Sequence, residues 1–255
     1  MKISLKPQHL KRYVEIARLF MRYGKSDVMS ELALDGIEPE PEASPNAPRP
    51  EDLANDLERM GPTFVKLGQI LSSRADLLPD AYLKALARLQ DNVKPFPYEE
   101  VEAMVEKELG ARISKAFGSF DREPLAAASL GQVHRATLRD GRKVCVKIQR
   151  PGIRKVIAED MEALNEIMTL LALTKFGRQY QVHRIFQEFK HTLVQELDYK
   201  REASNMVVIG ENLKEFDLIN IPQPIQSFCT SNVLTMEFVE GQKITSMTPL
   251  SRMDF

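Results

Sequence analysis

The feature that most constrains the fold is a pair of strand-like segments in the middle of a chain that is otherwise patterned for helices. Residues 132–138 and 143–149 read as β-strands, and Asp140-Gly141 between them is typical of a tight hairpin turn. Pro151-Gly152 ends the second segment, and residues 233–239 have the pattern of a further strand. The sequence therefore predicts a small antiparallel sheet.

Helical periodicity surrounds this sheet, so we expect a protein of the α+β class. The helices expected are residues 5–34, three pieces between Glu51 and Asn92, Glu99–Leu109 with Gly110 as C-cap, residues 155–173, and residues 183–214. The chain divides into a basic helical segment (1–35), a Pro/Glu-rich linker (36–50), a helical extension (51–122), a mixed lobe with inserted helices at about 153–190 (123–241), and the start of a connection to a further lobe (242–255).

Composition excludes several classes of protein. The 255 residues are 43% hydrophobic and 28% charged, which suits one or two globular domains, and the net charge of −1 gives no reason to expect nucleic-acid binding. The cysteines, Cys145 and Cys229, form no C-x-x-C pair, so we expect neither a disulfide framework nor a zinc site. With no secretory signal and no apolar run of about 18 residues, we expect a soluble, intracellular, cytoplasmic protein.

The N-terminal helix leaves two interpretations open. Basic residues gather on one face of it, at Lys6, Lys11, Arg12, Arg18, Arg22 and Lys25. Such a helix can lie on a membrane surface, which would make the protein peripheral there. The alternative is the solvated face of a helix that packs elsewhere in the protein.

A candidate phosphate-binding loop precedes the hairpin. Residues 126–133 follow the spacing G-x-G-x-x-G-x-V, with Ala126 and Ala128 in place of the first two glycines and Gly131 as the third. Each added Cβ limits how closely the backbone approaches a phosphate and removes the option of a positive φ. We therefore predict a stiffer loop than that of an ordinary protein kinase.

Lys147 is the candidate cation of the site. Strand alternation places Val144 and Val146 on one face and Cys145 with Lys147 on the other. An inward lysine needs an anion, which would be a nucleotide phosphate or a carboxylate. Alone, the segment would also suit an edge strand with a solvent-facing lysine, but the loop at the right spacing favours binding, with Cys145 against the adenine.

Acidic residues that could oppose this lysine follow in residues 195–202. Asp198 and Glu202 stand four apart, so we expect them on one helical face, with Glu196 just before them. Lys147 and Lys66 are the cations expected opposite. The alternative is an ordinary charged helix in which neighbouring basic side chains balance the acids.

Together these residues resemble the UbiB/AarF-type atypical kinase-like family, which is related to proteins that support ubiquinone synthesis. The resemblance runs from about Glu51 to Gly241, and it is carried by Lys66-x-Gly68-Gln69, the Ala-rich loop, Lys147, Glu196-x-Asp198 and Glu202. It implies a protein-kinase-like N-lobe preceded by a helical extension that folds over the active site, with Lys147 paired to Glu202 and Lys66 meeting Glu196 and Asp198.

The resemblance also implies the roles of single residues. Nucleotide contacts are expected from Ala126, Ala127, Ala128, Ser129, Gly131, Val133, Cys145, Lys147, Glu202 and a hinge at Met236, Glu237 and Val239. Regulatory roles are expected for Lys66, Gly68, Gln69, Glu196 and Asp198.

The implied function is that of an ATP- and Mg²⁺-dependent ATPase or phosphotransferase supporting isoprenoid-quinone biosynthesis. The expected partners are a nucleotide, a membrane surface or isoprenoid lipid, and quinone-biosynthesis proteins. The catalytic loop and the metal-binding D-F-G aspartate are expected beyond residue 255, in a C-lobe absent from this chain, so no catalytic or metal residue is assigned here. The alternative is a non-catalytic partner- or lipid-binding module; the two alanines and the extension disfavour a conventional protein kinase.

Overall fold

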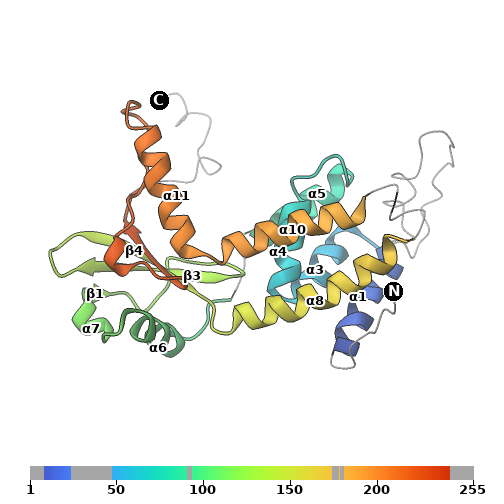
Figure 1. The fold of residues 1–255 in the computed structure, drawn as a ribbon, viewed down its shortest axis with the longest axis horizontal. Coiled ribbons are helices and arrows are strands. Elements are labelled where there is room, and N and C mark those ends of the chain that lie inside the picture. Colours follow the sequence, from blue (N-terminus) through green and yellow to red (C-terminus); the bar gives the residue numbers. More distant parts are fainter. Residues whose placement is uncertain (1–8, 24–47, 91–93, 174–177, 179–180, 242–255) are drawn as a thin grey trace.

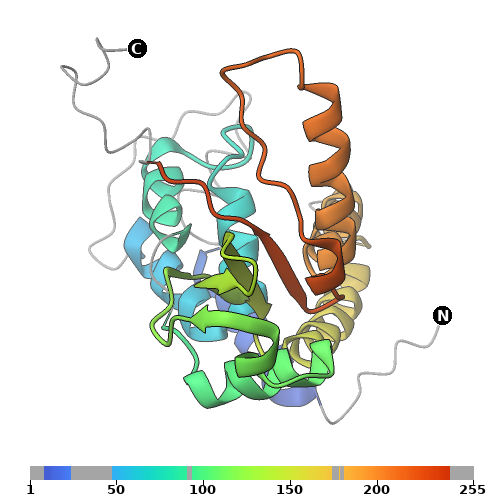
Figure 2. The same ribbon diagram turned by 90° about the vertical axis from the view of Figure 1, so that its left-hand side faces the viewer.

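The computed structural model describes residues 9–23, 48–90, 94–173, 178 and 181–241. Two parts stand side by side: a small sheet with its helices, and a bundle of helices (Figure 1). The view turned by 90° shows the sheet in front of the bundle, with one long helix rising beside the last strand (Figure 2). Each part has its own hydrophobic cluster.

Five strands form one antiparallel sheet in the described part of the chain. They are β1 (Phe117–Phe120), β2 (Ala126–Ala127), β3 (Gly131–Leu138), β4 (Lys143–Gln149) and β5 (Val233–Glu237). The order is β1-β3-β4-β5, with β2 also paired to β3. The predicted hairpin is confirmed: Gly141 takes a φ of 90° in the turn between β3 and β4.

The two faces of β4 differ as alternation predicts. Val144, Val146 and Ile148 are fully buried and pack in one cluster with residues of helix α6 (Tyr98–Leu109). Cys145 and Lys147 lie on the opposite face and are half-buried. The predicted C-cap of α6 is also confirmed, because Gly110 adopts the left-handed conformation with a φ of 67°.

The bundle contains the three helical pieces predicted between residues 51 and 92. Its described helices are α1 (Leu10–Tyr23), α3 (Pro50–Met60), α4 (Pro62–Leu71), α5 (Asp80–Ala87), α8 (Ile153–Leu171) and α10 (Val182–Glu196). Gly61, with a φ of 98°, separates α3 from α4, and Pro62 opens α4. In α4, a Cβ at Gly68 would lie 2.5 Å from Cδ1 of Leu89, so this glycine allows close helix packing.

Helix α1 packs into the bundle. Ile16 is fully buried, and the guanidinium of Arg12 donates to Oδ1 of buried Asp160 at 2.6 Å. Lys11 and Arg18 remain exposed, so part of the basic face is solvated. Lys6 and Lys25 lie outside the described residues. The linker predicted at 36–50 also lies outside them, except for its last three residues, 48–50.

The single helix predicted over residues 183–214 is wrong. Helix α10 ends at Glu196, and α11 (Tyr199–Asn212) begins after Asp198, whose backbone is not helical. The Asp198 carboxylate accepts a hydrogen bond from the backbone N–H of Arg201 at 3.2 Å, as an N-cap does. Asp198 and Glu202 therefore do not share one helical face.

The boundary predicted at residue 123 also differs from the packing. Strand β1 pairs with β3, and the cluster beneath the sheet begins at Phe96, so residues 96–120 pack with the sheet and not with the preceding helices. The prediction missed β1 and the short helix α7 (Ile113–Ala116), because a four-residue element has too little periodicity to recognise. Strand β5 ends at Glu237, two residues before the predicted end.

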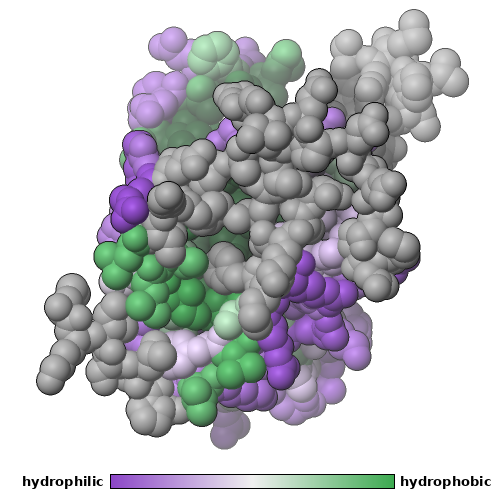
Figure 3. All heavy atoms as spheres, turned by 90° about the vertical axis from the view of Figure 1, so that its right-hand side faces the viewer, coloured by the Kyte–Doolittle hydropathy of each residue, from purple (hydrophilic) through white to green (hydrophobic). Residues whose placement is uncertain are grey.

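The bundle end of the molecule carries hydrophobic surface beside hydrophilic side chains (Figure 3). Helix α8 ends on this side, and Leu170 and Leu173 near its end are exposed. Within the described ranges, no helix combines the length and the apolar character needed to cross a membrane.

Candidate functional site

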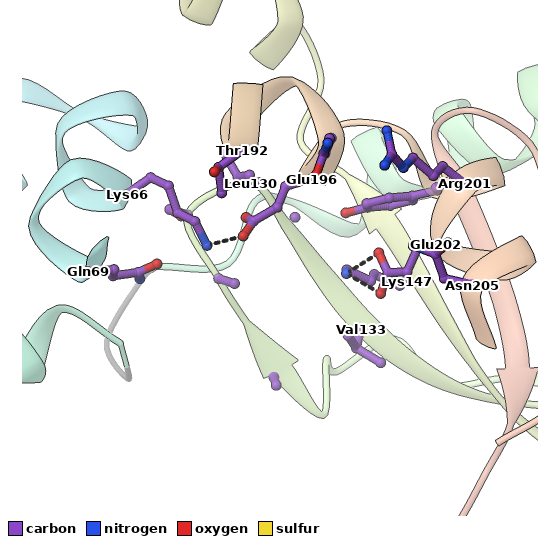
Figure 4. A pocket seen from close by; sticks show the side chains of 16 residues that line it. Lys66, Gln69, Leu130, Val133, Lys147, Thr192, Glu196, Arg201, Glu202 and Asn205 are labelled. Carbon is purple, nitrogen blue, oxygen red and sulfur yellow. Dashed lines mark hydrogen bonds and ion pairs between the residues drawn. The ribbon is translucent and has the colours of Figure 1, made fainter. Parts of the chain in front are cut away.

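A cavity of about 580 Å³ lies between the bundle and the sheet. Its wall comes from α4, the Ala-rich hairpin, β4, the end of α10 and the start of α11 (Figure 4). The lining residues are Lys66, Gln69, Ala126, Ala128, Ser129, Leu130, Gly131, Val133, Lys147, Thr192, Gln195, Glu196, Tyr199, Arg201, Glu202 and Asn205.

The Ala-rich loop is a tight β-hairpin between β2 and β3. The N–H of Ala128 donates to the carbonyl of Gly131 at 2.7 Å, which leaves only Ser129 and Leu130 in the turn. The N–H of Arg150 donates to the carbonyl of Leu130 at 2.8 Å, so the turn is also tied to the residue after β4. Ser129 and Leu130 are both buried.

Packing explains why position 131 is a glycine. A Cβ at this position would lie 2.4 Å from the carbonyl oxygen of Ile148 and 2.8 Å from the hydroxyl of Tyr199. An alanine at position 131 could be accommodated only if the backbone moved. At Ala126 and Ala128 the hairpin accepts a side chain, and both alanines line the cavity.

Lys147 and Glu202 form the predicted pair. Nζ of Lys147 donates to both carboxylate oxygens of Glu202 at 2.8 Å, and the side chains keep 30% and 37% of their exposure (Figure 4). The ammonium also lies 4.7 Å from the centre of the Tyr199 ring. The lysine is therefore held at the cavity wall by a carboxylate and a ring, and its charge still reaches solvent.

A second lysine reaches the cavity from the bundle. Lys66 on α4 pairs with Glu196 at the end of α10, and it is more buried than Lys147 (Figure 4). Gln69, one turn further along α4, donates to the carbonyl of Leu89 at 2.9 Å. Lys66 meets Glu196 as predicted, but the expected contact with Asp198 is wrong, because that carboxylate caps α11 instead.

The bend between α10 and α11 brings the two glutamates to one cavity. At the bend, the Leu197 carbonyl accepts a hydrogen bond from Nε2 of Gln149 at 3.0 Å and a second from the guanidinium of Arg154. Arg154 also donates to Oε1 of Gln149 at 2.9 Å. The sequence gives no sign of this clamp of Gln149 and Arg154 on Leu197, since neither residue belongs to a recognised motif.

Tyr199 was also missed. Its side chain is 1% exposed and lines the cavity, and its hydroxyl has no hydrogen-bond partner in the described part of the chain. Burial raises the pKa of Tyr199, and the carboxylates of Glu202 and Glu196 add to the rise. The phenol is therefore a neutral donor without an acceptor. The burial of its hydroxyl arises from tertiary contacts, so no local sequence signal could have found it.

Several predicted residues lie outside the lining of this cavity. Gly68 packs against leucine side chains, Ala127 pairs with Gln132 in the hairpin, and Cys145 pairs with Met236 across β4 and β5. The carboxylate of Glu237 accepts a hydrogen bond from the N–H of Gln223 at 3.0 Å. Burial raises the pKa of the Cys145 thiol, so it stays protonated. The hinge residues Met236, Glu237 and Val239 remain predictions.

A small antiparallel sheet, a strand lysine paired with a helix glutamate, and a hairpin at the cavity define a lobe of the protein-kinase-like class. A family model described as "ABC1 atypical kinase-like domain" matches residues 88–255. The chain belongs to this UbiB-type atypical kinase-like family.

Individual relatives agree with this assignment. A protein of Cellvibrio japonicus named "Probable protein kinase UbiB" is 37% identical over 250 residues, covering 94% of this chain and 45% of that protein. "Protein ACTIVITY OF BC1 COMPLEX KINASE 8, chloroplastic" of Arabidopsis thaliana is 40% identical over 204 residues, or 79% of this chain and 27% of that one. The chain thus spans less than half the length of these two relatives.

A solved structure is also similar to this chain. It is the complex of Rv3197 with erythromycin from Mycobacterium tuberculosis, with 29% sequence identity and a TM-score of 0.49. The similarity covers 69% of this chain and 44% of that one.

Proposed function

We propose that this chain is the ATP-binding part of a UbiB-type ATPase or phosphotransferase that supports isoprenoid-quinone (ubiquinone) biosynthesis. The observation that carries the proposal is the pair of 2.8 Å contacts from Lys147 to Glu202 at the wall of the cavity. In kinase-like lobes a strand lysine oriented in this way contacts the nucleotide phosphates. The relatives named UbiB support the family context.

The size and charge of the cavity suit a nucleotide. Its volume of about 580 Å³ falls within the usual range for small-molecule sites, roughly 300–1,000 Å³. Lys66, Lys147 and Arg201 line the cavity together with Glu196 and Glu202, so the lining has one more cation than carboxylates. A polyphosphate would meet cations from both parts of the molecule.

The described residues do not by themselves provide a set of ligands for Mg²⁺. Among them, no group of three or more Asp, Glu, His or Cys side chains could hold a metal ion. The two carboxylates nearest the proposed phosphates, Glu196 and Glu202, are each paired with a lysine. Mg²⁺ in kinase-like enzymes neutralises phosphate charge, and we assign no metal-dependent step to these residues.

In the proposed enzyme, each pair has its own task. Glu202 orients Lys147 toward the phosphates, while the Lys66–Glu196 pair joins α4 to the end of α10. A protein segment approaching the cavity from this side would have to displace α4. The partners we propose for the complete enzyme are a membrane surface or isoprenoid lipid and quinone-biosynthesis proteins.

The test is nucleotide affinity of the full chain, measured by isothermal titration calorimetry. Lys147→Ala should weaken ATP binding by about tenfold or more, because it removes a charge-assisted contact. Lys155→Ala, which removes an exposed lysine from α8, is the matched control and should leave the affinity unchanged. Circular dichroism of both variants checks that they fold. Equal ATP affinity in Lys147→Ala and the wild type would contradict the proposal.

A further inference from the structure

A second cavity of about 750 Å³ adjoins the Ala-rich hairpin. Ser129 lines both this cavity and the nucleotide cavity, so the turn of the hairpin is a wall that the two share. The remainder of the wall comes from the junction of α3 and α4, from Arg88 and Leu89 just after α5, from Lys94 and Pro95, and from Arg150 after β4. Apart from Ser129 of the Ala-rich loop, no residue of the motifs found in the sequence lines this cavity.

The charge of the lining is unbalanced. Arg88, Lys94 and Arg150 supply three cations, while Glu58 supplies the one carboxylate. The Arg88 guanidinium contacts Oδ1 of Asn55, which is neutral, and Nη2 of Arg150 donates to the backbone carbonyl of Lys94 at 2.9 Å. In the described part of the chain, none of these cations forms an ion pair with an acid, and Glu100 acts on Arg150 without an ion-pair contact, so the lining keeps an excess of positive charge.

Arg150 is the most constrained of the three cations. Its guanidinium lies over the Phe96 ring, 5.2 Å from the ring centre, and its Nε is buried without an acceptor among the described residues. Burial lowers the pKa of Arg150. A desolvated cation without a carboxylate partner among the described residues is costly, and an anionic ligand in the cavity would supply the counter-charge.

We propose that this cavity binds a phosphate-bearing ligand, with Arg88, Lys94 and Arg150 around the phosphate. Guanidinium groups suit this task because their planar donors match the geometry of phosphate oxygens. Val65 and Leu89 give the wall an apolar part that suits the non-phosphate portion of the ligand. The ligand is therefore a phosphate ester with an apolar portion, and its source is either a lipid headgroup or a soluble metabolite.

The proposed site lies next to the turn of the Ala-rich hairpin. The backbone N–H of Arg150 holds the Leu130 carbonyl at 2.8 Å, and Ser129 separates the two cavities. A phosphate held by the Arg150 side chain would therefore lie beside the turn that lines the nucleotide cavity. The inference does not depend on what occupies that other cavity.

Calorimetric titration of the full chain tests the site, with glycerol phosphate and monomeric dihexanoyl phosphatidic acid as probes. Saturable binding is expected, and the double variant R88Q/K94Q should weaken it by about fivefold or more. Both replaced side chains are exposed, so folding should be retained. The control K115Q/K155Q removes two exposed lysines elsewhere and should bind as the wild type does.

A Lys147→Ala variant separates this site from the nucleotide cavity. It should bind both probes as tightly as the wild type, whereas binding at the nucleotide cavity would be lost in this variant and kept in R88Q/K94Q. Tighter binding of the lipid than of glycerol phosphate assigns the site to a headgroup with its acyl chains, and equal affinity assigns it to a soluble ester. Absence of saturable binding, or equal affinity in R88Q/K94Q and wild type, would overturn the inference.

Discussion

Replacing Gly131 with alanine tests the reason that one glycine survives in the Ala-rich hairpin. The added Cβ would lie 2.4 Å from the Ile148 carbonyl oxygen and 2.8 Å from the Tyr199 hydroxyl. The carbonyl belongs to β4, which pairs with β3 on one side and β5 on the other, so it cannot retreat without disturbing two ladders. Overpacking of this kind costs about 1–3 kcal/mol.

The assay is urea unfolding followed by circular dichroism, with Gly68→Ala as the comparison. The Cβ at Gly68 also meets an atom at 2.5 Å, but that atom is the end of the flexible Leu89 side chain, so we expect the smaller loss of stability there. Adding Tyr199→Phe to Gly131→Ala should recover only part of the loss, because the contact with the Ile148 carbonyl remains. A Gly131→Ala protein within about 0.5 kcal/mol of the wild type would refute the reasoning.

Three further predictions concern stability and membranes. Arg12→Ala should lower the free energy of unfolding by about 3–5 kcal/mol in urea, because it strands the buried Asp160 carboxylate; a loss under about 1 kcal/mol would contradict this. Burial lowers the pKa of His134 below its unfolded value near 6.5, so the unfolded state binds the proton first. Stability should therefore fall as the pH drops below about 6.5, by at most about 1.4 kcal/mol per pH unit, and a His134→Gln variant should lack this component. If the basic face of α1 binds membranes, Lys11→Gln with Arg18→Gln should reduce flotation with anionic liposomes while leaving stability unchanged, and equal flotation would exclude that face.

Much of the sheet could be predicted because its signals are local. The Asp140-Gly141 turn and the alternation in β4 depend on neighbouring residues only, and they placed Lys147 on the correct face. The pairing of Lys147 with Glu202 joins residues far apart in sequence, so periodicity alone left a phosphate and a carboxylate as equal candidates. The resemblance to a family named Glu202 as the carboxylate partner and kept the phosphate contact of Lys147 as an expectation.

The remaining parts depend on tertiary contacts that no local pattern encodes. Asp198 is a residue type that favours N-caps over helix interiors, but the periodicity continues past it, and the clamp of Gln149 and Arg154 on Leu197 favours the break. Tyr199 looked like one more helical residue until its hydroxyl proved to be buried against Gly131. The sequence therefore predicted the ion pairs of the site but not the bend that brings them together.

The most direct test of the central claim is to label the protein with an acyl-phosphate derivative of ATP, which acylates lysines beside its phosphates. Digestion and mass spectrometry then identify the modified residues. We predict modification of Lys147 or Lys66, the lysines that line the cavity, and loss of that modification when excess ATP competes. Labelling confined to lysines outside the cavity, such as Lys115 or Lys155, or labelling that ATP does not suppress, would contradict the account.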